Sequence, residues 1–94
     1  MAVVGVIVWQ LEIIGSQSLK EKRSVVKSLK ERLQSRFRVS AAETNYQDVW
    51  QRAELAAAVV SGDQHHVSEV LDATDRLVLN DMRVRVISVQ RSYH

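Results

Sequence analysis

The chain has 94 residues, of which 46% are hydrophobic and 26% are charged, a balance that fits one globular domain over residues 1–94 and excludes a disordered chain. Because cysteine is absent, a disulfide framework, a thiolate metal site and a cysteine nucleophile are excluded, and the composition favours the cytoplasm. Thirteen basic and eleven acidic residues leave a formal net charge of +2, too little by itself to indicate nucleic-acid binding.

The first predicted element is a strand over residues 3–13, with apolar side chains on both of its faces. Ile7, Trp9 and Leu11 share the face that we expect to meet the core. A row of three valines, Val4, Val6 and Val8, lies on the other face. This segment lacks a preceding basic region and is too short to span a bilayer, so neither a signal peptide nor membrane contact is expected.

A capping box marks the start of the first predicted helix, because Ser18 is followed three residues later by Glu21. Apolar residues then recur with helical period from Leu19 to Phe37. A basic stripe, defined as Lys20, Arg23, Lys27 and Lys30, runs beside them at spacings of three and four residues. These features predict an amphipathic helix with a cationic surface.

Lys22 lies at the centre of the apolar face of this helix. It must either extend to the surface from the first turn or pair internally with Glu43 or Asp48. We favour internal pairing, since buried ammonium groups normally have a partner.

The rest of the chain predicts a strand over residues 38–43, a polar loop over 44–50 and a strand over 51–60. A second helix then runs to Asn80, and a last strand over residues 82–90 is followed by a polar tail. In this strand we expect Arg83, Arg85 and Arg91 on one side, and Val84, Val86 and Ser88 on the other. The order βαββαβ predicts an α+β, ferredoxin-like fold, with two helices on one face of a four-stranded antiparallel sheet.

Three segments carry a family resemblance. They are Ser18-Leu-Lys-Glu-Lys-Arg23, Phe37-Arg-Val-Ser40 and Glu43-Thr-Asn-Tyr-Gln-Asp-Val-Trp-Gln-Arg52. Together they resemble the YlxP-like family of small bacterial proteins, whose function is unknown and whose fold is ferredoxin-like. Genes of this family lie near genes for transcription elongation, translation initiation and ribosome maturation, so the resemblance implies an RNA-related context. Arg38 departs from it, because a neutral polar residue is expected there.

The leading functional hypothesis is a module that binds RNA or a ribosomal subunit. The basic stripe and Arg38 would bind phosphates, while Tyr46 and Arg52 would position a base or a turn of the backbone. The alternative for the stripe is a solvated helix face. For the loop, the alternative is structural: Trp50 plugs the end of the core while Asp48 and Arg52 form a hydrogen-bonded brace.

A rival hypothesis is a homodimeric scaffold for a protein partner, paired through the valine row, although the C-terminal tail could also cover that face. A weaker one is a small phosphorylated ligand bound at Ser16 to Ser18. No metal or cofactor is expected, since His65 and His66 diverge on a helix and lack further ligands. No catalytic triad can be recognised from the spacing, so we do not expect an enzyme.

Overall fold

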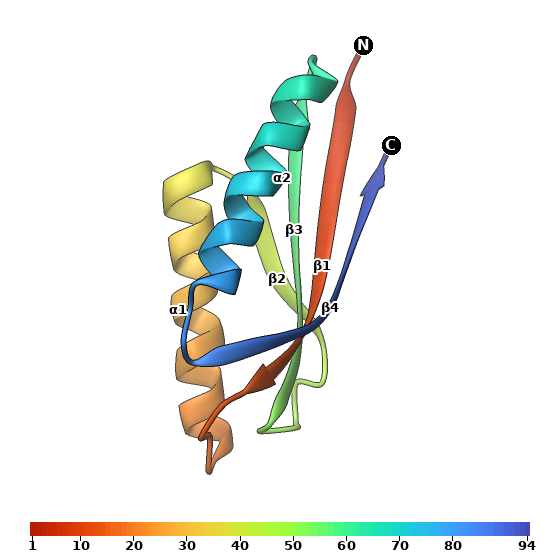
Figure 1. Ribbon diagram of the computed structural model, residues 1–94. Helices are drawn as coiled ribbons and strands as arrows, with labels where there is room; N and C mark the ends of the chain where they lie inside the picture. The colour runs from red at the N-terminus through yellow and green to blue at the C-terminus, as the bar shows by residue number, and fades with distance from the viewer.

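The computed structural model describes residues 1–94 and has the predicted order βαββαβ (Figure 1). Its strands are β1 (Val3–Ile13), β2 (Ser40–Asn45), β3 (Arg52–Ser61) and β4 (Val84–Tyr93), and its helices are α1 (Leu19–Phe37) and α2 (Gln64–Leu79). The strands form one antiparallel sheet in the order β2-β3-β1-β4, so β1 is paired on both sides. Both helices cover the same face of this sheet (Figure 1). The ferredoxin-like prediction is therefore confirmed.

Helix α1 begins and ends with hydrogen bonds that explain its limits. Ser18 Oγ accepts from the Glu21 N–H at 3.1 Å, and Glu21 Oε2 accepts from the Gln17 N–H at 2.7 Å. At the other end Arg38 adopts the left-handed conformation, with φ of 55°, and its N–H donates to Gln34 O at 3.0 Å. Such a residue closes a helix and cannot belong to a strand. The strand predicted to begin at Arg38 therefore begins two residues later, at Ser40.

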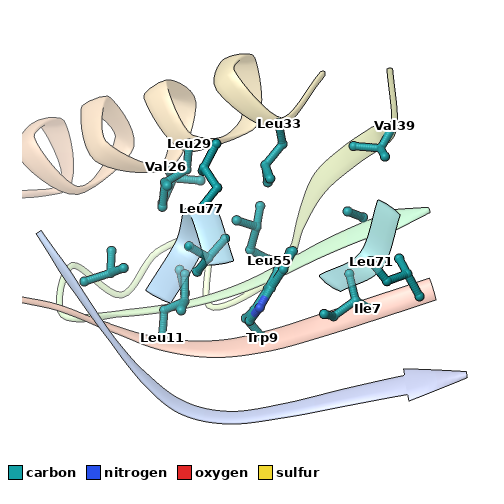
Figure 2. Close-up of a cluster of buried hydrophobic side chains, with 14 of the residues drawn as sticks. Ile7, Trp9, Leu11, Val26, Leu29, Leu33, Val39, Leu55, Leu71 and Leu77 are labelled. Carbon is teal, nitrogen blue, oxygen red and sulfur yellow. The ribbon is translucent and has the colours of Figure 1, made fainter. Parts of the chain in front are cut away.

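The core lies between the helices and one face of the sheet (Figure 2). Ile7, Trp9 and Leu11 are fully buried there, as the alternation in β1 predicts. Leucines of both helices pack against them, including Leu29, Leu33 and Leu71. The indole Nε1 of Trp9 donates to Asp75 Oδ1 at 2.9 Å, which satisfies the polar atom of the largest buried side chain.

Gly5 is the point of closest approach between β1 and α2. A Cβ atom added there would clash with Val67 Cγ1 and lie 3.1 Å from Leu71 Cδ1. Val67 is β-branched and sits in a helix, so it has little rotamer freedom to move away. Gly5→Ala should therefore lower the free energy of unfolding by about 1–2 kcal/mol.

Urea denaturation followed by circular dichroism measures this effect. Gly62→Ala is the matched control, because a Cβ atom there would meet nothing nearer than Met1 O, at 3.8 Å. Equal stability of the two variants would contradict the packing described for Gly5.

Strand β4 differs from its prediction in two ways. The register against β1 shifts between Gln10, opposite Ser88, and Leu11, opposite Val86, so Ile87 is an extra residue in a β-bulge. Residues after Ile87 therefore face the opposite side of the sheet from the one that the alternation in the sequence predicts. The prediction that all three arginines share one side is therefore wrong: Arg85 pairs with Glu12 on the sheet face away from the helices, whereas Arg91 pairs with Asp72 of α2 at 2.7 Å.

The predicted C-terminal tail is also part of β4. The strand runs to Tyr93 rather than ending near residue 90. His94 then exchanges two backbone hydrogen bonds with Val4, at 2.8 and 2.9 Å. The tail consequently does not cover the sheet face that carries the valine row.

Candidate nucleic-acid interface on the first helix

The basic stripe lies on the solvent side of α1. Lys20, Arg23 and Lys27 are exposed, and Lys30 is partly exposed. The stripe extends over about 15 Å, given a rise of about 1.5 Å per residue. Two of its members have acidic neighbours, at the long distance of 4.0 Å in both cases: Arg23 with Asp48, and Lys27 with Glu31. Such exposed pairs are weak and screened by salt, so the cations remain available to a ligand.

A shallow groove runs between α1 and the outer edge of β2, which is the edge strand of the sheet. Arg23, Lys27 and Lys30 line its helical side. Two neutral amides also line it: Gln34 Nε2 donates to Ala41 O at 3.2 Å, and Gln47 Nε2 donates to Glu43 O at 3.4 Å. The full lining is Arg23, Val26, Lys27, Lys30, Glu31, Gln34, Glu43 and Gln47, which we call the basic groove.

Lys22 ties α1 to the hairpin between β2 and β3. Its side chain is fully buried, and Nζ forms an ion pair with Glu43. The same atom donates to Tyr46 O at 2.7 Å, and Gln47 O lies 3.5 Å away. The predicted internal pairing of Lys22 is therefore confirmed, and its partner is Glu43 rather than Asp48. This contact holds one end of the basic groove in place.

The hairpin loop does not have the structural role considered from the sequence. Trp50 is 39% exposed, so it does not plug the core, whose largest site is filled by Trp9. The Asp48 side chain is 93% exposed and lies nearer Arg23 than Arg52. The loop also begins later than predicted, because β2 continues to Asn45.

Tyr46 and Arg52 contact each other rather than the basic stripe. The guanidinium carbon of Arg52 lies 5.0 Å from the centroid of the Tyr46 ring, a cation–π contact. Arg52 lies opposite Glu12 in the register of β3 against β1, so its side chain lies on the sheet face away from α1. The sheet thus separates Arg52 from the cations of the stripe.

Arg38 extends the line of cations but does not join the groove. It follows Lys30 by eight residues, or about 12 Å along the helix, and its side chain is exposed at the C-terminal end of α1. Gln34 and Gln47 were not anticipated as site residues. Gln34 could have been found, because it continues the stripe four residues after Lys30.

The N-terminus of α1 is not an open anion site. Its capping box already places the Glu21 carboxylate against the Gln17 N–H, so a phosphate would meet a negative charge there. This geometry does not favour the phosphorylated-ligand hypothesis at Ser16 to Ser18.

The two histidines of α2 do not belong to a larger cluster of metal-binding side chains. His65 contacts Glu69 at 3.0 Å, and no cluster of three or more His, Cys, Asp or Glu side chains is arranged to hold a metal ion. Neither helix combines the length and the apolar character that crossing a membrane requires.

Residues 4–91 match the family model described as "Protein of unknown function (DUF503)". The chain belongs to this family. The Bacillus subtilis (strain 168) protein described as "Uncharacterized protein YlxP" is 46% identical over 52 residues, which cover 55% of this chain. The match spans only 56% of the length of YlxP. The resemblance to the YlxP-like family is thus confirmed, and the DUF503 description assigns no activity.

Solved structures similar to this DUF503 chain support the fold alone. The structural genomics protein YJCS has a TM-score of 0.60 at 15% identity, and the alignment covers 95% of this chain and 96% of YJCS. A de novo designed protein with a ferredoxin fold, LFR1 1, has a TM-score of 0.53 at 13% identity, with 100% and 86% of the two chains covered.

Proposed function

We propose that this protein is a non-enzymatic cytoplasmic module that binds RNA, free or within a ribosomal subunit, through the basic groove. The observation that carries the proposal is the arrangement of Arg23, Lys27 and Lys30 along one wall of a groove. The positive charges of Arg23 and Lys27 are offset only by long, exposed ion pairs. Phosphate contacts of this kind supply most of the sequence-independent affinity for nucleic acid. The genomic context implied by the family resemblance also supports RNA as the partner.

In this proposal the three groove cations bind successive phosphates, while Lys20 and Arg38 extend the path at either end of α1. Gln34 and Gln47 each keep a second amide hydrogen for a phosphate or ribose oxygen. Tyr46 and Arg52 lie outside this centre, and we assign them contacts only with RNA long enough to pass around the hairpin. The exposed indole of Trp50 can stack on an unpaired base at the same place.

The test is a binding titration against ribosomal RNA fragments and whole ribosomal subunits over a range of salt concentrations. Binding should be saturable and weaken steeply between about 50 and 200 mM salt. Replacing all four stripe residues by glutamine should abolish binding at low micromolar protein without changing the melting temperature.

A matched pair of double variants separates the groove from general charge. Lys27→Gln/Lys30→Gln and Arg36→Gln/Arg76→Gln each remove two positive charges, but only the first pair lies in the groove. The first variant should lose at least tenfold in affinity, and its log–log salt slope should fall by about 1.4 for single-stranded RNA. Equal losses in both variants, or binding that does not respond to salt, would argue against the proposal.

A further inference from the structure

The sheet face opposite the helices is divided into an uncharged half and a charged half, and the uncharged half carries this inference. In the register, Val4 lies opposite Val60, Val6 opposite Ala58 and Val8 opposite Ala56. The neighbouring positions on the two outer strands are small or neutral. They are Ser40 and Ala42 on β2, and Ser88, Gln90 and Ser92 on β4. None of these eleven side chains is charged.

The uncharged half has a ridge and a trough side by side, so its shape can match that of a second copy of the same surface. The partly exposed valines of β1 form a ridge along the centre of the sheet. Beside the ridge lies a trough in which Ala42, Ala56 and Ala58 are lined up across β2 and β3, with Val6 and Ser40 at its borders. When two such faces meet about a two-fold axis, the ridge of each can enter the trough of the other.

The charged half is held within the chain by hydrogen bonds and one ion pair. Glu54 accepts hydrogen bonds from Thr44 at 2.5 Å and from Gln10 at 2.7 Å, which together hold the pKa of its carboxyl below the ordinary value. Glu12 pairs with Arg85 at 3.0 Å. Glu54 has no cation bound to it, so this end suits the polar rim of an interface, where the carboxylate keeps its contact with water.

Nothing within residues 1–94 covers the face. Both helices lie on the opposite side (Figure 1), and the C-terminal residues are held in β4 by the bonds between His94 and Val4. The 37 residues of the four strands, at about 3.3 Å per residue and about 4.8 Å between strands, give a whole face of roughly 600 Å². The charged half must therefore belong to the contact as its rim for the area to approach the roughly 800 Å² per partner of a standard stable interface.

We infer that this face binds the same face of a second copy of the chain, in a two-fold sheet-to-sheet dimer with the valine ridge of each copy in the alanine trough of the other. The lack of charge excludes a phosphate backbone as the occupant. The proposal is independent of RNA binding in the basic groove, because α1 and that groove lie on the far side of the sheet; only the Arg52 contact assigned to longer RNA lies on the same face as the dimer.

Sedimentation velocity on the full chain between 1 and about 100 μM tests the dimer. The wild type should sediment at twice the chain mass, and Val6→Lys at the chain mass. Met82→Lys is the matched control, because it adds the same charge at an exposed position in the turn before β4 and should stay dimeric. Ala42→Glu provides a second disruption at an exposed trough position, in case Val6→Lys fails to fold.

Three outcomes would overturn the inference. The first is a wild-type chain that is monomeric at about 100 μM, which would leave the face to a different protein. The second is a dimer that survives Ala42→Glu. The third is a dimer that Met82→Lys disrupts as strongly as Val6→Lys does. Lys27→Gln/Lys30→Gln should remain dimeric while it loses RNA, so failure of one proposal is distinguishable from failure of the other.

Discussion

Lys22→Ala is expected to lower the free energy of unfolding by about 3–5 kcal/mol, the largest effect of any single substitution considered for this chain. The substitution leaves the Glu43 carboxylate, whose side chain is only 13% exposed, without its cation. It also removes the donor to Tyr46 O and empties the space of a fully buried side chain. An uncompensated buried charge and a cavity both destabilise the folded state.

Urea denaturation at neutral pH, followed by circular dichroism, measures this loss. Lys20→Ala, on the exposed side of the same helical turn, should change stability by less than about 0.5 kcal/mol. The double variant Lys22→Met/Glu43→Gln should recover much of the loss, since it removes both charges and keeps most of the volume. If Lys22→Ala were as stable as Lys20→Ala, the buried pair would not be what holds the hairpin to α1.

Asp81→Ala should have the second-largest effect, a loss of about 2–3 kcal/mol. The Asp81 carboxylate is 3% exposed and accepts from Arg83 Nη2 at 2.6 Å, from Arg83 Nε at 3.0 Å and from Arg32 Nη1 at 3.2 Å. Through Arg32 it connects the turn after α2 to α1. Both guanidiniums are nearly half exposed and can be hydrated when the carboxylate is removed, which is why the expected loss is smaller than for Lys22.

The same cluster predicts a dependence of stability on pH. The hydrogen bond from Arg83 is the main reason that the pKa of Asp81 lies below its ordinary value. A carboxyl with a lowered folded-state pKa contributes stability above its unfolded pKa of about 3.9 and loses it as the pH falls through the folded value. Thermal melts should therefore show wild-type stability falling below about pH 4, with a shallower fall in Asp81→Ala. Parallel acid profiles for the two proteins would contradict this role.

Local patterns made much of the fold predictable. The alternation around Trp9, the capping box at Ser18 and the apolar period of α1 each depend on residues close together in the sequence, and each is found in the structure. The basic stripe was predictable for the same reason, since helical spacing alone brings Lys20 to Lys30 onto one surface.

The remaining differences depend on contacts between distant segments. A bulge is set by how β4 fits against β1, so the reversal at Ile87 that turns Arg91 toward α2 leaves no trace in the local pattern. Trp50 could not be placed from its hydrophobicity, because Trp9 already occupies the core. The groove itself required the edge of β2 to lie beside α1, which brings Gln47 within the same site.

The central place of β1 determines the order in which the sheet can be completed during synthesis. This valine-rich strand is made before the other three, and its two neighbours, β3 and β4, are made about fifty and eighty residues later. A nascent chain that lacks residues 84–93 therefore carries β1 as an unprotected sheet edge, the kind of surface that pairs with other chains. The arrival of the last strand both finishes the fold and ends the period in which the new chain is prone to aggregate.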